Sequence, residues 1–68
     1  MVTNMKDVIS HFCKNYSVLI LFTNTGEYRT SPVLMSVLDE GVIIADNDDK
    51  RFISYKAILE IKAELFSA

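Results

Sequence analysis

The side chains best suited to catalysis are few in this chain of 68 residues, and they do not combine into a site. The only histidine is His11 and the only cysteine is Cys13. Two positions apart on a predicted helix, their side chains diverge, so they cannot form a nucleophile–base pair or share a metal ion. We expect His11 to be a solvated helix residue, and the sequence predicts no metal site.

The acidic residues form neither a complete calcium-binding loop nor a complete acid–base pair. Segment 46–49 resembles the start of a calcium loop but lacks the glycine and the distal glutamate of an EF-hand, so we expect a polar hairpin tip. Asp39 and Glu40 have no histidine beside them that would assign acid and base roles. The only glycines are Gly26 and Gly41, so there is no phosphate-binding glycine loop. We therefore expect a protein that is not an enzyme and that uses no cofactor.

The first structural element that the sequence predicts is a helix from Asn4 to Asn15. Asn4 followed by Asp7 is typical of a capped N-terminus, with an acid where the helix dipole favours it. The apolar residues have the spacing of one helical face: Met5, Val8, Ile9, Phe12 and Tyr16.

After Tyr16 the apolar period changes to two, which predicts strands joined by short turns, an arrangement typical of an antiparallel meander. Strand 18–22 is apolar on both faces, so we expect a barrel interior to cover one face and the helix the other. Gly26 ends a hairpin turn and is expected at positive φ. Pro32 cannot donate to a ladder, and we expect one strongly bent strand around it. The five predicted strands are 18–22, 27–38, 42–45, 51–54 and 57–63.

The composition fits one small domain, residues 1–68, that needs a partner for stability. Half of the residues are hydrophobic, and a single cysteine cannot form an intramolecular disulfide, so we expect oligomerisation. The net charge is −2, whereas proteins that coat nucleic acid usually carry a net positive charge, so the overall charge does not support that role. No apolar run of about 20 residues predicts a membrane span, and no signal pattern opens the chain. We expect a cytoplasmic protein.

Three segments resemble the Sm-like superfamily and, within it, the bacterial Hfq family of RNA chaperones. They are Val-Leu-Ile-Leu-Phe-Thr-Asn at 18–24, Leu-Asp-Glu-Gly-Val-Ile-Ile at 38–44, and Ile-Ser-Tyr-Lys-Ala-Ile-Leu-Glu-Ile at 53–61. The last aligns without a gap on the family's Ile-Tyr-Lys-His-Ala-Ile-Ser-Thr-Ile. The resemblance implies a mainly β fold, with an N-terminal α-helix followed by a strongly bent five-stranded antiparallel sheet, an Sm-like open β-barrel.

The resemblance also implies a homo-oligomeric ring, a hexamer, in which the fourth strand of one subunit pairs with the fifth strand of the next. We expect five residues to carry this interface: Phe52, Ile53, Ile58, Leu59 and Ile61. The alternative is that these residues fill only the core of one protomer, because cores and sheet edges use the same residue types.

The family binds single-stranded RNA near the pore of the ring, in post-transcriptional regulation. By this resemblance, the proximal site of the present chain would contain five residues: Asp39, Glu40, Gly41, Tyr55 and Lys56. Glu40 and Gly41 stand where the family has a glutamine and a stacking aromatic residue, and Tyr55 and Lys56 stand where it has a lysine and a histidine. The uridine pocket is therefore eroded. Tyr55 is expected to stack on a base and Lys56 to contact phosphate. The alternatives are a packed corner residue and a solvated charge.

Further RNA contacts implied by the resemblance are a distal pair, Tyr28 and Arg29, and a rim cation, Lys14. An aromatic residue beside an arginine suits base stacking and phosphate contact. The alternative for Arg29, as for Lys50 and Arg51, is solvated surface. A different class of function also stays open, in which a small β-barrel acts as a protein–protein interaction or scaffolding module and does not bind RNA.

Overall fold

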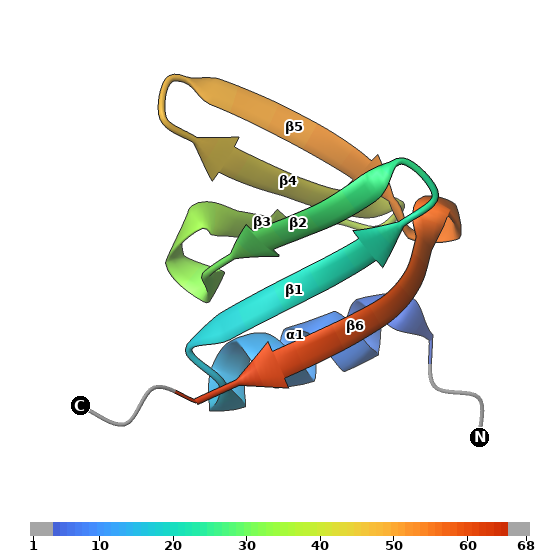
Figure 1. The fold of residues 1–68 in the computed structure, drawn as a ribbon. Coiled ribbons are helices and arrows are strands. Elements are labelled where there is room, and N and C mark those ends of the chain that lie inside the picture. Colours follow the sequence, from blue (N-terminus) through green and yellow to red (C-terminus); the bar gives the residue numbers. More distant parts are fainter. Residues whose placement is uncertain (1–3, 66–68) are drawn as a thin grey trace.

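The computed structural model describes residues 4–65. Helix α1 spans Met5–Asn15, and two 3-10 helices, η1 and η2, span Pro32–Leu34 and Tyr55–Ala57. The strands are β1 Val18–Thr23, β2 Gly26–Thr30, β3 Met35–Val37, β4 Gly41–Asp46, β5 Asp49–Ser54 and β6 Ile58–Glu64. They form two antiparallel three-stranded sheets, called here the first sheet, ordered β2-β1-β6, and the second sheet, ordered β3-β4-β5 (Figure 1).

Helix α1 begins and ends where the sequence predicts. The Asn4 side-chain oxygen accepts a hydrogen bond from the backbone N–H of Asp7 at 2.9 Å, which satisfies one of the free donors of the first turn. At the other end, the Tyr16 N–H donates to the Phe12 carbonyl at 2.9 Å. The predicted helix and its capping residue are confirmed.

The segment around Pro32 differs from the single bent strand that we predicted over residues 27–38. The ladder of β2 ends at Thr30, Pro32 begins η1, and β3 starts only at Met35. Proline lacks an N–H for the ladder, and its fixed φ suits the first position of a helical turn. The Leu34 N–H closes this turn by donating to the Ser31 carbonyl at 3.0 Å. The described residues therefore contain six strands in two open sheets, where we predicted five strands in one bent sheet.

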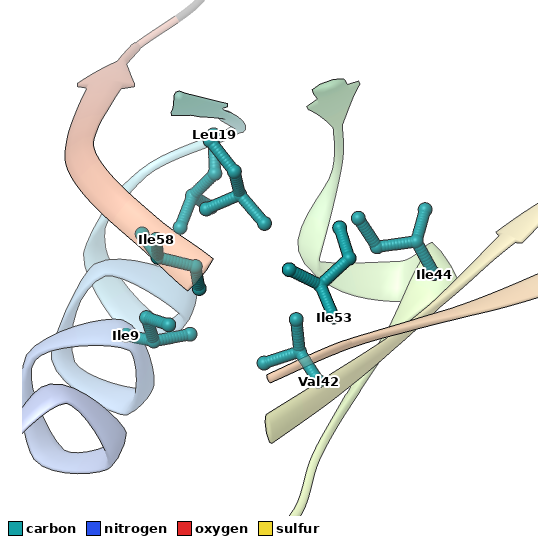
Figure 2. Packing of buried hydrophobic residues seen from close by; sticks show 7 residues of the cluster. Ile9, Leu19, Val42, Ile44, Ile53 and Ile58 are labelled. Atoms are coloured by element: carbon teal, nitrogen blue, oxygen red, sulfur yellow. The ribbon is translucent and has the colours of Figure 1, made fainter. Parts of the chain in front are cut away.

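The core lies between the two sheets and is closed on one side by α1 (Figures 1 and 2). Figure 2 shows Leu19 and Ile58 of the first sheet facing Val42, Ile44 and Ile53 of the second, with Ile9 reaching in from the helix. Buried side chains from both sheets and the helix make up the cluster: Ile9, Leu19, Leu21, Val42, Ile44, Ile53 and Ile58.

The outer face of β1 is covered by charged residues and not by the helix, contrary to our expectation. Ile9 of α1 packs on the same side of β1 as Leu19 and Leu21. On the opposite face, Ile20 is 7% exposed and is paired across the strands with Arg29 and Lys62. The hydrocarbon stems of such long side chains cover apolar surface while their charges stay in water.

Two turns need unusual backbone angles. Gly26 has φ of 148°, so the predicted turn with a glycine at positive φ is confirmed. Asn47 has φ of 56° at the tip between β4 and β5, a conformation that asparagine tolerates better than most residues. No helix in residues 4–65 is long and apolar enough to cross a membrane.

Candidate nucleic-acid interface

Four of the five residues predicted for the proximal site lie around one surface hollow of about 380 Å³. The hollow is formed by the turn between β3 and β4 and by η2, which meet because Gly41 of β4 pairs with Ser54 of β5. Its lining residues are Asp39, Glu40, Ser54, Tyr55 and Lys56. We call it the turn hollow. Residues separated by about 15 positions in the chain are thus brought together by the β4–β5 ladder.

Two hydrogen bonds donated by backbone N–H groups hold the Tyr55–Lys56 corner in place. The Ser54 hydroxyl accepts from the Lys56 N–H at 3.3 Å and caps η2. The Tyr55 N–H donates to the Glu40 carbonyl at 3.2 Å, which ties the corner to the β3–β4 turn. Lys56 is exposed, so its ammonium group is free to meet an anion at the mouth of the hollow.

The phenol of Tyr55 already makes a hydrogen bond within the chain. Its hydroxyl donates to the Leu38 carbonyl at 2.5 Å, and its ring packs against the core. Burial raises the pKa of this phenol, opposed in part by the ammonium of Lys6, so the group stays protonated and keeps donating at neutral pH. The half-buried Tyr55 is therefore a packed corner residue that presents only part of its ring to a ligand.

Lys6 is a cation of this site that the sequence did not lead us to select. Its ammonium lies 2.5 Å from a carboxylate oxygen of Asp39 and joins the first turn of α1 to the β3–β4 turn. This ion pair raises the pKa of Lys6 and lowers the pKa of Asp39. A cation in the first helical turn interacts unfavourably with the helix dipole. This unfavourable position was the only feature of the sequence that could have marked Lys6 as a functional residue. With Glu40 and Lys56, the site carries two charges of each sign.

Gly41 has a structural role that excludes a side chain. A Cβ atom at this position would lie 2.3 Å from the Ile53 carbonyl oxygen and 2.7 Å from Cζ of Phe52. The residue is buried and belongs to the β4–β5 ladder. Gly41 therefore cannot itself present a stacking surface, and the Phe52 ring fills the space beside it.

The predicted distal pair, Tyr28 and Arg29, does not come together. Adjacent residues of β2 point to opposite faces of the sheet: Tyr28 packs against the core, whereas Arg29 forms an ion pair with Glu64 at 3.4 Å. The aromatic–cation contact of the structure is instead between Tyr28 and Arg51, whose guanidinium carbon lies 5.1 Å from the ring centroid. Arg51 was expected to be solvated surface. Sequence patterns do not reveal a contact between residues of different sheets.

The five predicted interface residues divide into two groups. Ile53 and Ile58 are each 6% exposed and belong to the chain's own core, and Ile61 packs against that core. Phe52 and Leu59 are 54% and 71% exposed and remain available to a partner. Leu59 lies where the β1–β6 register shifts, at the bulge of a strand on the edge of its sheet.

None of the remaining candidates lines the turn hollow. Lys14 is exposed in the last turn of α1, where a positive charge interacts favourably with the helix dipole. Burial raises the pKa of the half-buried Cys13 thiol, which lowers its reactivity. His11 lies on the exposed side of the helix beside Asn15. Within the described chain, no group of three or more His, Cys, Asp and Glu residues could hold a metal ion.

Comparisons with known proteins identify no relative of this chain. No protein-family model matches the sequence. Searches of curated proteins and of solved structures give no significant match. The functional argument therefore rests on the chain's own residues.

Proposed function

We propose that this protein binds single-stranded RNA as an Sm-like, Hfq-like homo-oligomer, with the turn hollow as the binding site of each protomer. The observation that carries the proposal is that Tyr55 and Lys56 line one surface hollow, with Lys6 held beside it by its ion pair with Asp39. An aromatic ring with nearby cations is the combination with which proteins bind unpaired bases and their phosphates. Because each protomer offers few cations, repetition around an oligomer would be needed to hold an RNA chain.

The free sheet edges support the oligomer. Among the described residues, four strands are paired on one side only: β2 and β6 at the edges of the first sheet, and β3 and β5 at the edges of the second. An unpaired edge offers a row of N–H and C=O groups to another strand. β5 carries Asp49, Lys50 and Arg51 and is net positive, whereas β6 carries Glu60, Lys62 and Glu64 and is net negative. Pairing of β5 in one protomer with β6 in the next would bring strands of opposite net charge together.

The test is RNA binding by the purified oligomer, measured by fluorescence anisotropy with a labelled U-rich oligoribonucleotide at several salt concentrations. Lys56→Ala is expected to weaken binding and to reduce its salt dependence, because a phosphate contact is lost. Lys62→Ala, which removes the same charge on the outer face of the first sheet, is the matched control. Wild-type affinity in both Lys56→Ala and Tyr55→Ala would exclude the turn hollow as the binding site.

A second function, protein binding without RNA, is favoured by an exposed apolar turn. Val33 is 91% exposed and its neighbour Leu34 is 49% exposed, both on η1. Two adjacent exposed aliphatic side chains suit a protein contact. Affinity capture after nuclease treatment separates the two functions. A protein that is retained by the wild type and lost by Val33→Asp, with no RNA recovered, would favour this second function.

A further inference from the structure

The outer face of the second sheet carries a half-exposed aromatic ring in an unusual setting. Val42, Ile44 and Ile53 point into the core, so the alternation of strand side chains puts Gly41, Ile43, Phe52 and Ser54 on the opposite face. On that face Phe52 is 54% exposed. Single exposed apolar side chains are common on protein surfaces, so exposure alone does not imply a ligand, and the way in which this ring is held carries more weight.

Gly41 determines how the Phe52 ring lies. The outer carbon atoms of the ring, Cζ and Cε1, come within 2.7 and 2.8 Å of the position that a Cβ atom of Gly41 would occupy. The ring of Phe52 therefore leans across β4 and lies over Gly41, which has no side chain. Its cross-strand partner, Ile43, supports it from β4. A ring held in this way loses little conformational freedom when a ligand covers its open side.

The direction of the lean separates Phe52 from the edge of the sheet. β5 pairs with β4 on one side only, and its other side is free. Because the ring leans toward β4, it leaves the free backbone edge of β5 open for another strand. Strand pairing at that edge would thus leave the exposed side of the ring accessible to a different partner.

A lysine precedes Phe52 in the sequence and another follows it. Lys50 precedes Phe52 by two positions, which places it on the same face of β5 at about 7 Å along the strand. Lys56 follows at the mouth of the turn hollow, and Ser54 both lines that hollow and shares the face of Phe52. The outer face of the second sheet and the turn hollow are thus adjacent parts of one surface, with an aromatic ring between two ammonium groups.

We propose that Phe52 is the platform on which an unpaired nucleobase stacks, with Lys50 contacting the adjoining phosphate. Aromatic rings on an open sheet face, flanked by cations, bind single strands in this manner, with bases covering the rings and the cations following the backbone. The inference rests on the proposed function and extends the RNA path from the turn hollow onto the second sheet. It also assigns Phe52 to RNA and not to the subunit interface.

The experiment compares Phe52→Leu and Phe52→Tyr with the wild-type oligomer, using a U-rich oligoribonucleotide that contains one 2-aminopurine. Leucine keeps apolar area but removes the π-face, whereas tyrosine keeps the ring. We expect Phe52→Leu to weaken binding about fivefold or more and to abolish the stacking-dependent quenching of 2-aminopurine, with Phe52→Tyr close to wild type. Leu34→Ala, another exposed apolar residue, is the control and is expected to bind normally.

The outcomes are distinct. Wild-type affinity and quenching in Phe52→Leu, while the wild type itself binds RNA, would overturn this inference and leave the proposed function intact. A lower native mass of Phe52→Leu by light scattering would overturn it in favour of a subunit-interface role. If the wild-type protein binds no single-stranded RNA at all, the proposed function fails and this inference fails with it.

Discussion

The guanidinium group of Arg51 lies over the ring of Tyr28, 5.1 Å from its centroid, and joins two sheets that share no ladder. Arg51 is paired with Ile44 on the core-facing side of β5, and Tyr28 with Leu21 on the core-facing side of β2. The two side chains therefore meet where the sheets diverge, beside a hollow of about 270 Å³. Among the described residues, no strand pairing joins the two sheets here, and the contact between Arg51 and Tyr28 covers this side of the core instead.

This contact is expected to stabilise the fold measurably. In a double-mutant cycle with Arg51→Ala and Tyr28→Leu, we expect a coupling free energy of about 0.5–1 kcal/mol, as for other exposed cation–π pairs. Urea unfolding of the four proteins measures it. The same cycle with Lys62→Ala and Tyr28→Leu is the control, because Lys62 lies on the outer face of the first sheet. A coupling of zero for Arg51 and Tyr28 would mean that the contact contributes nothing to stability.

The local elements of the fold were predictable from the sequence because their causes are local. Asn4 caps the helix through Asp7, and Gly26 alone permits the φ of its turn. Pro32 signalled an interruption, but the sequence did not show whether the strand bends or stops. That depended on whether η1 could form its own hydrogen bond from Leu34 to Ser31. The fold around Pro32 was therefore predicted only in part.

The candidate site was harder to predict because its contacts join residues far apart in the chain. Tyr55 and Lys56 were found through a resemblance, whereas Lys6 and Asp39 form an ion pair across 33 positions of the chain. Tyr28 and Arg29 are neighbours in sequence, and strand alternation separates them. Such pairings follow from how sheets and helix are placed in space, which periodicity alone does not determine.

Replacement of Gly41 by alanine should destabilise the protein strongly. The added Cβ would lie 2.3 Å from the Ile53 carbonyl oxygen, so the ladder between β4 and β5 must shift. We expect a loss of about 1–3 kcal/mol in the free energy of unfolding, as for other overpacked sites. Ser36→Ala on the same sheet face is the control. The double variant Gly41→Ala/Phe52→Ala should not recover full stability, because the carbonyl oxygen remains in place.

The ion pair of Lys6 with Asp39 should make stability depend weakly on pH and salt. The pKa of Asp39 is lowered in the fold, so its contribution is present above the ordinary carboxylate pKa and is lost as pH falls through the lower folded value. The pKa of Lys6 is raised, so its contribution is present below the ordinary lysine pKa and is lost as pH rises through the higher folded value. Between these limits the pair contributes fully.

Urea midpoints of wild type and Asp39→Asn across pH test this relationship. We expect a small difference at neutral pH that disappears in acid, and that is smaller in high salt because both groups are exposed. Asp48→Asn, at the tip between β4 and β5, is the control. A difference that persists unchanged at the lowest pH would show that Asp39 acts through something other than its charge.

Two variants of Tyr55 should separate its packing from its hydrogen bond. Tyr55→Phe removes the bond to the Leu38 carbonyl and is expected to lower the free energy of unfolding by about 0.5–1.5 kcal/mol while leaving the ring in place. RNA binding by Tyr55→Phe should then stay close to wild type, whereas Tyr55→Ala should bind more weakly. Equal RNA affinities of Tyr55→Ala and wild type would limit Tyr55 to a structural role.

The assembly itself is tested by the native mass, measured by light scattering at micromolar concentration before and after nuclease treatment. We expect a mass near six chains that nuclease does not change, because strand pairing between β5 and β6 needs no RNA. Leu59→Asp places a charge at the bulge of the β6 edge, where the side chain is 71% exposed, and should lower the mass. Val33→Asp is the control, since Val33 lies on η1 and belongs to neither edge strand. A wild-type monomer would remove the repeated RNA site and favour the protein-binding function, because one protomer offers too few cations to hold an RNA chain.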